Sequence, residues 1–309
     1  MIDHSELISV ERNESPTLTV GIPAGRDIDW TGRILSGLES PVTNVEVLVA
    51  RWKENPLTAQ ELEDLNNFFP TKEVSSDTRH APAMRNAIIR ETTSTHILFL
   101  DDDMVPGQDL LASALVLAAC EPDVVHQGIP YRVTNSHSWL ARTEGRLYER
   151  AYKRCIDGDD NVSILDARLM LASVETLRDT SFDESLVFGG GEGRELARSL
   201  TEKGVVLRLA RELDAAHTNR DTMASLAEQK QAHGRGRGHE LLKHGPGENG
   251  WLNYFASYAW RHYLEPAVKR TKGELDTEEL IYVWGTNTVL WAGVFEYIVR
   301  YDLRSKQKG

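Results

Sequence analysis

The run from Ile97 to Asp103 constrains the fold of this chain more than any other stretch, because it joins four consecutive apolar residues to three aspartates. Four apolar residues in a row are typical of a buried strand. In an open α/β sheet, ligands bind at the carboxyl ends of the strands, where these aspartates would lie. Carboxylate oxygens suit Mg²⁺ or Mn²⁺, and such an ion can hold a diphosphate. The simpler alternative is an acidic turn before a helix that ends near Cys120.

Strand and helix patterns alternate on both sides of this run. Strands are expected at Thr17–Ile22, Val45–Ala50, Lys72–Val74, His96–Leu100, Val124–Gln127, Val162–Leu171 and Val205–Leu209, the last at a sheet edge. Helices are expected at Trp30–Leu38, Ala59–Phe69 with a capping box from Thr58 and Glu61, Ala81–Glu91, Leu140–Lys153 and Glu195–Lys203. This alternation predicts an α/β fold with a mostly parallel sheet and helices on both faces.

The last quarter of the chain has a different pattern. A polar helix is expected at Thr222–Ala232, and the alternating glycines and arginines of Gly234–Gly238 fit neither a regular helix nor a strand. We therefore place a domain boundary near residue 240, between a catalytic region, 1–240, and a C-terminal helical appendage, 241–309. Aromatic residues recur at helical spacing in Trp251–Lys269. Core or dimer packing is their default role, which leaves a homodimer open, and a sugar-stacking or lipid-facing surface is the alternative.

Composition excludes several classes of protein. The net charge of -12 lacks the basic footprint of a nucleic-acid binder, so no nucleic-acid partner is expected. Two cysteines, Cys120 and Cys155, do not suggest a disulfide framework, and we expect a cytoplasmic protein. The first 14 residues lack the pattern of a signal peptide. The segment Ile281–Val299 contains Asn287 and Glu296, so we expect a core or interface helix there and no membrane contact.

Four ordered pieces of the sequence resemble the nucleotide-sugar glycosyltransferases of the GT-A fold, most closely glycosyltransferase family 2. They are the first strand with Ile22–Pro23, the segment Ala83–Asn86, the strand that ends in Asp101–Asp103, and Phe182–Asp183 leading to Gly189–Glu192 and then His217. The resemblance covers about residues 17 to 238 and implies a Rossmann-like fold.

The same pieces supply candidate residues for binding a nucleotide sugar. The loop Pro23, Ala24, Gly25, Arg26, Asp27 follows the first strand, where a base or ribose would lie. Arg85 could pair with a diphosphate or brace Asp101. Gly190 and Gly191 let a ligand approach the backbone closely. The resemblance implies that Asp101 and Asp102 face the ribose and the diphosphate.

Metal ligands and a base complete the expected site. The resemblance implies that Asp103 binds the metal, and His217 is a plausible further ligand for Mn²⁺ or Mg²⁺. Glu192 is the candidate base that takes the proton of an acceptor hydroxyl, and Glu195 is the reserve. The related motif usually reads Glu-Asp, whereas this chain has Gly193 after Glu192.

Two further features of the sequence bear on the expected site, and the first of them departs from the family pattern. The family often has an acidic residue after the second strand that reads the base, and this chain has Arg51-Trp52-Lys53 there, where Trp52 could stack on a base instead. The basic run Lys230–His244 could form a mobile lid over the diphosphate, or a solvated loop.

Together these observations predict a metal-dependent glycosyltransferase of the hexosyltransferase type. It would move a sugar from a nucleoside-diphosphate sugar to a hydroxyl acceptor, with inversion if Glu192 is the base. The alternatives are a retaining enzyme, a nucleotidyltransferase, for which the loop Pro23–Arg26 is too short, and a catalytically silent binding protein that kept the fold.

Overall fold

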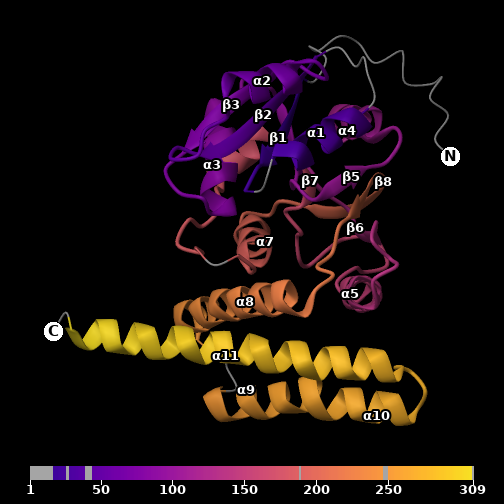
Figure 1. Cartoon of the computed structure of the whole chain (residues 1–309), viewed down its shortest axis with the longest axis vertical. Coiled ribbons are helices and arrows are strands. Elements are labelled where there is room, and N and C mark those ends of the chain that lie inside the picture. Colours follow the sequence, from indigo (N-terminus) through magenta and orange to yellow (C-terminus); the bar gives the residue numbers. More distant parts are fainter. Residues whose placement is uncertain (1–16, 26–27, 39–43, 188, 246–249, 308–309) are drawn as a thin grey trace.

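The computed structural model describes residues 17–307 apart from 26–27, 39–43, 188 and 246–249. These residues form a central sheet with helices on both faces, followed by a stack of C-terminal helices (Figure 1). The predicted α/β class with a helical C-terminal part is therefore confirmed.

In the described residues the sheet has eight strands in the order β3-β2-β1-β4-β7-β6-β8-β5. Its first four strands are all parallel and have nearly the predicted bounds. The eight strands are β1 Leu18–Pro23, β2 Val45–Trp52, β3 Thr71–Ser76, β4 His96–Leu100, β5 Met104–Pro106, β6 Val125–Val133, β7 Leu169–Ser173 and β8 Leu207–His217.

The strand β4 lies at the centre of the core and is buried on both faces. Successive side chains of a strand point to opposite faces, so Ile97 and Phe99 pack in one hydrophobic cluster while Leu98 and Leu100 pack in the other. The helices around the sheet are α1 Ile28–Gly37, α2 Ala59–Asn66, α3 Ala81–Glu91, α4 Leu110–Cys120, α5 Trp139–Lys153, α6 Val174–Asp179 and α7 Glu192–Glu202. The predicted capping box at Thr58 is present.

Two predicted strands differ from the observed ones. Only the end of Val162–Leu171 is a strand, β7, which runs antiparallel to both β4 and β6. The predicted edge strand Val205–Leu209 is the start of β8, which lies inside the sheet, and the edge is β5. The segment 163–168 is therefore a loop that arrives at the end of β4.

The Gly234–Gly238 run was expected to be irregular, and this expectation is wrong. The run lies inside one long helix, α8 Met223–His244. Close packing explains its glycines. A Cβ at Gly234 would lie 1.9 Å from the carbonyl oxygen of Leu290, and one at Gly236 would lie 2.4 Å from that of Gly190. The predicted boundary near residue 240 falls within this helix, and the division into two domains stays a prediction.

The C-terminal helices stack outward from α8 (Figure 1). They are α9 Gly250–Ala259, a π-helical turn Trp260–Leu264, α10 Glu265–Thr271 and α11 Thr277–Gln307. Tyr258 packs edge-on against Trp291, which joins α9 to α11. None of the helices formed by the described residues has the continuous apolar length that a bilayer crossing requires.

Candidate functional site

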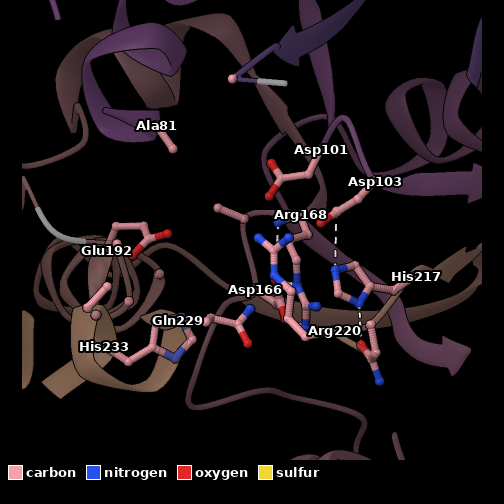
Figure 2. A pocket seen from close by; sticks show the side chains of 18 of the residues that line it. Ala81, Asp101, Asp103, Asp166, Arg168, Glu192, His217, Arg220, Gln229 and His233 are labelled. Atoms are coloured by element: carbon pink, nitrogen blue, oxygen red, sulfur yellow. Dashed lines mark hydrogen bonds and ion pairs between the residues drawn. The ribbon is translucent and has the colours of Figure 1, made fainter. Parts of the chain in front are cut away.

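A cavity of about 790 Å³ lies at the sheet edge where β1 and β4 end. Pro23 and Gly25 follow β1, Asp101–Asp103 follow β4, and all of them line the cavity. Because β7 is antiparallel to β4, its first residue Leu169 pairs with Leu100, and the residues before it reach the same edge. Further lining residues come from α5, α7 and α8, as Figure 2 shows in part.

Arg85, from α3, is buried beneath the cavity and is not among the residues that line it. Its Nη2 donates to Oδ1 of Asp101 at 2.5 Å, and its Nη1 lies 3.8 Å from Oε1 of Glu192. Burial would lower the pKa of Arg85, but the two carboxylates outweigh it and raise the pKa, so the guanidinium stays charged. Of the two roles predicted for Arg85, these contacts are those of a brace for Asp101.

The three aspartates crowd negative charge at the end of β4. Burial raises the pKa of Asp101 to about 6; Arg85 opposes this rise, and repulsion from Asp103 and Asp102 adds to it. Asp102 and Asp103 are themselves buried. A cation near this cluster would offset the repulsion.

The sheet register brings Asp103 and His217 together. Met104 of β5 pairs with His217 of β8, so Asp103 lies beside the imidazole. Oδ1 of Asp103 is 3.2 Å from Nε2 of His217, as the dashed line in Figure 2 marks, and both side chains are buried. These are the two residues predicted to be metal ligands.

Asn219 determines which ring nitrogen of His217 carries a proton. Nδ2 of Asn219 donates to the carbonyl of Ala141 at 2.9 Å, so its Oδ1 faces Nδ1 of His217 and accepts a hydrogen bond from it. In the neutral ring, Nε2 then presents a lone pair to the Asp103 carboxylate. A nitrogen lone pair and a carboxylate oxygen at 3.2 Å need a proton or a cation between them. Metal-binding histidines usually have their other ring nitrogen hydrogen-bonded to a partner, as Nδ1 of His217 is to Asn219.

The pair therefore fits a divalent ion such as Mn²⁺ or Mg²⁺. No group of three or more His, Cys, Asp or Glu side chains in the described part of the chain is placed to hold a metal. The remaining ligands of the ion would be water or phosphate oxygens, which is usual for Mg²⁺ bound through one or two protein side chains.

The glycine loop brings Glu192 to the cavity from the α7 side (Figure 2). Gly189, Gly190 and Gly191 have φ values of 70°, 78° and 101°, which favour glycine, and α7 begins directly after them at Glu192. Oε2 of Glu192 is buried and accepts no hydrogen bond from the described residues. Glu192 lines the cavity, so a ligand hydroxyl that reached this oxygen would supply the partner that it lacks.

Packing explains the glycine that follows Glu192. A Cβ at Gly193 would lie 2.1 Å from the carbonyl oxygen of Leu165, so the loop before β7 can approach α7 only at a glycine. Glu195, the reserve base, pairs with Lys243 at 2.5 Å and with His244 at 2.8 Å and does not line the cavity. Of the two candidate bases, Glu192 is the one placed at the site.

The loop after β1 is described in part. Arg26 and Asp27 lie outside the described residues. Ala24 is buried and does not line the cavity, and its carbonyl accepts a hydrogen bond from Nη1 of Arg51 at 3.2 Å. Arg51 thus has a structural contact with this loop, and Trp52 is half-buried away from the cavity lining.

The basic run does not form a loop or lid, because it belongs to α8 and its charges are paired. Lys230 and His233 line the cavity, and Lys230 pairs with Glu144 at 2.5 Å. Further along, Arg235 pairs with Glu296 of α11 at 3.2 Å. Burial, with Lys230 nearby, lowers the pKa of His233 to about 3, so its ring is neutral.

Sequence reasoning missed part of the cavity wall. The missed lining residues include Arg79, Glu144, Tyr148, Asp166, Arg168, Asn219, Arg220 and Gln229. The one available signal was the pair of charged residues, Asp166 and Arg168, in an otherwise apolar segment predicted to be a strand.

Comparison with known proteins bears on the fold. No model of a protein family matches the sequence, and no curated protein matches it. Among solved structures 267 chains match. One of them is the mannosyltransferase PcManGT from Pyrobaculum calidifontis in complex with GDP-Man and Mn²⁺. The match has a TM-score of 0.59 and 14% identity and covers 93% of this chain and 88% of that chain, so the two proteins share a fold.

Proposed function

We propose that this chain is a glycosyltransferase that moves a sugar from a nucleoside-diphosphate sugar to a hydroxyl acceptor. The observation that carries the proposal is that Asp101–Asp103, His217 and Glu192 meet at one cavity on the ligand-binding edge of the sheet. PcManGT, which has the same fold, binds a nucleotide sugar and Mn²⁺, and this supports the same class of ligand here.

In this proposal the donor lies along the strand ends. Pro23 and Gly25 would contact the base or ribose, and Asp101 and Asp102 the ribose and diphosphate. Asp103 and His217 would hold Mn²⁺ or Mg²⁺, which neutralises charge on the diphosphate when bound. Arg85 lies beneath the cavity, where its guanidinium holds the Asp101 carboxylate in place through a hydrogen bond.

Glu192 is the proposed base. As the acceptor oxygen bonds to the anomeric carbon of the sugar, its proton passes to the Glu192 carboxylate. The bond between the anomeric carbon and the phosphate oxygen breaks, and its electron pair stays on the nucleoside diphosphate. Attack from the side opposite the leaving group gives inversion. A retaining enzyme, in which no carboxylate of the protein takes this proton, is the alternative mechanism.

A catalytically silent protein is the alternative outside enzymes. Two departures from the family pattern favour it a little, namely the missing aspartate after Glu192 and the Arg51-Trp52 pair after the second strand. Gly193 replaces the usual aspartate because Leu165 packs against it, and Arg51 binds the carbonyl of Ala24. Both departures from the family pattern therefore have packing reasons that leave the cavity intact.

Glu192→Gln tests the proposal. The wild-type protein, offered UDP-, GDP-, dTDP- and CDP-sugars with Mn²⁺, should release the nucleoside diphosphate from at least one of them. Glu192→Gln should slow transfer by about 10²- to 10⁴-fold, because the general base is lost, while donor affinity stays unchanged. Glu195→Gln is the matched control on the same helix and should transfer at nearly the wild-type rate.

Two results would count against this proposal. Near-normal transfer by Glu192→Gln would remove Glu192 from the mechanism and favour retention. If the wild-type protein turned over none of these donors with Mn²⁺ or Mg²⁺, the assignment as a glycosyltransferase would fail.

A further inference from the structure

Arg168 is a cation in the cavity wall to which no part of the proposed reaction has yet given a role. It lies in the loop before β7, and its backbone carbonyl accepts a hydrogen bond from the Asp101 N–H at 3.1 Å. This bond anchors the loop at the end of β4. The guanidinium lines the cavity, and in Figure 2 it lies near Asp103 and His217.

The position of the guanidinium is fixed from several sides. Its Nε donates to Oδ1 of Asp166 at 2.9 Å and its Nη2 donates to Oδ2 at 2.6 Å, which is a two-pronged ion pair. Its Cζ lies 4.9 Å from the centre of the Tyr148 ring. Such an arginine loses little rotational freedom when an anion binds, because its neighbours have already ordered it.

Asp166 is itself held in place by a buried network. Its backbone N–H donates to Oε1 of Gln127 at 2.5 Å, and its carboxylate also accepts from the hydroxyl of Tyr148. Nε2 of Gln127 donates to the carbonyl of Leu169 at 2.8 Å, which ties the network to the first residue of β7. Asp166 and Tyr148 are thus positioning residues for the guanidinium.

The guanidinium has donors beyond those that Asp166 needs. Arginine carries five N–H groups in a planar fork, more than one carboxylate accepts in a two-pronged pair. Burial would lower the pKa of Arg168, but Asp166 and, more weakly, Asp103 outweigh it and raise the pKa well above its usual range. The group is therefore a permanent cation close to the Asp103–His217 pair.

We propose that Arg168 is a fixed cation that binds the diphosphate of the donor beside the metal held by Asp103 and His217. The inference rests on the proposed function and adds to it a phosphate-binding residue. Planar, two-pronged recognition of phosphate oxygens is the chemistry for which arginine is suited. Asp166 holds the guanidinium in place and leaves it charged.

Calorimetric titration with inorganic pyrophosphate in the presence of Mn²⁺ tests this inference, because the probe has no base and no sugar. Arg168→Gln combined with Asp166→Asn removes both charges and keeps a hydrogen-bonding pair, so that no buried carboxylate is left alone. This double variant should bind pyrophosphate about tenfold more weakly or worse. Arg168→Lys keeps the positive charge and loses the planar fork of N–H groups. Its affinity for pyrophosphate should lie between those of the wild type and the double variant.

The matched control is Arg211→Gln combined with Asp160→Asn, which removes an exposed ion pair of 2.6 Å outside the cavity lining and should bind as the wild type does. Circular dichroism and thermal melting of each variant confirm that it is folded. Wild-type binding that persists undiminished in the Arg168 double variant would overturn this inference and leave the proposed function standing. Absence of binding by the wild-type protein itself would overturn both.

Discussion

Three ion pairs lie in or directly beside the cavity wall, and in each of them the two partners fix one another. Arg85 braces Asp101, Arg168 pairs with Asp166, and Lys230 pairs with Glu144. Breaking one member of a buried pair leaves an uncompensated charge, which costs more than the pair contributes. Glu192 faces Arg85 through Oε1 at 3.8 Å, and its Oε2 has no hydrogen-bond partner in the described residues. Together with its place in the cavity lining, this makes Glu192 the candidate base.

Asp166 gives a prediction about pH. Burial would raise the pKa of Asp166, but attraction and hydrogen bonds from Arg168 and Tyr148 lower it from 3.8 to about 2. Because the folded-state pKa is lowered, ionised Asp166 stabilises the fold above pH 3.8, by roughly 2 kcal/mol, and this contribution is lost as the pH falls towards about 2. Asp166→Asn should therefore lose stability at neutral pH, and its deficit should shrink in acid.

Urea unfolding of the wild type and Asp166→Asn, from neutral pH down to the lowest pH at which both are folded, measures this difference. A free-energy difference that stays constant over the whole range would show that Asp166 is not a strongly ionised group in the native state.

Single residues were predictable from sequence when they followed a recognisable run. Asp101–Asp103 and Glu192 were found because an apolar strand or a glycine run precedes each of them. Arg168 was not found, because the sequence favoured a longer strand there and gave no sign that the strand starts beside the end of β4. Its place depends on β7 being antiparallel, which no local pattern of residues encodes.

At the scale of elements, the helix α8 connects the site to the C-terminal helices. One side of it meets the glycine loop at Gly190, and another meets α11 at Leu290. Glycine has a low helix propensity, and this local preference favoured an irregular segment at Gly234–Gly238. The requirement for close packing against two neighbours outweighs it, and those neighbours are distant in sequence.

Two glycines in helices give opposite predictions. Gly234→Ala should lower the melting temperature, because the new Cβ would lie 1.9 Å from the carbonyl oxygen of Leu290. Gly285→Ala in α11, where nothing lies within 4 Å, should stabilise the protein by up to about 1 kcal/mol through helix propensity. Thermal melting of the two variants side by side tests the packing. A stabilising Gly234→Ala would show that α8 and α11 are not in close contact.

At the scale of the whole molecule, the parallel half of the sheet and its helices followed from the alternation of patterns. The other half, in which β7 and β5 are antiparallel to their neighbours and β6 and β8 are parallel to each other, did not. The predicted bounds of α3 and β4 match the observed ones. A division near residue 240 was predicted from composition, yet α8 crosses it and carries Lys230 and His233 to the cavity. The C-terminal helices therefore support the site through α8.

Removal of residues 250–309 tests this support. The deletion should lower the melting temperature and weaken nucleotide binding, because α11 buries Tyr282 and Val294 and covers α8, where Leu226 and Leu241 are buried. Burial of each large apolar side chain contributes about 1.5–3 kcal/mol. A shortened protein with an unchanged melting temperature and unchanged affinity would instead support two independent domains.

The account depends most on a divalent ion at Asp103 and His217 that holds a diphosphate. The direct measurement is calorimetric titration of the wild type and Asp103→Asn with UDP, GDP, dTDP and CDP, with Mn²⁺ and with EDTA. Asp157→Asn, in an exposed loop outside the cavity lining, is the control. We predict that at least one nucleotide binds the wild type with Mn²⁺, and that EDTA or Asp103→Asn weakens it by about tenfold or more. Equal affinity under all of these conditions, or no binding at all, would contradict the account.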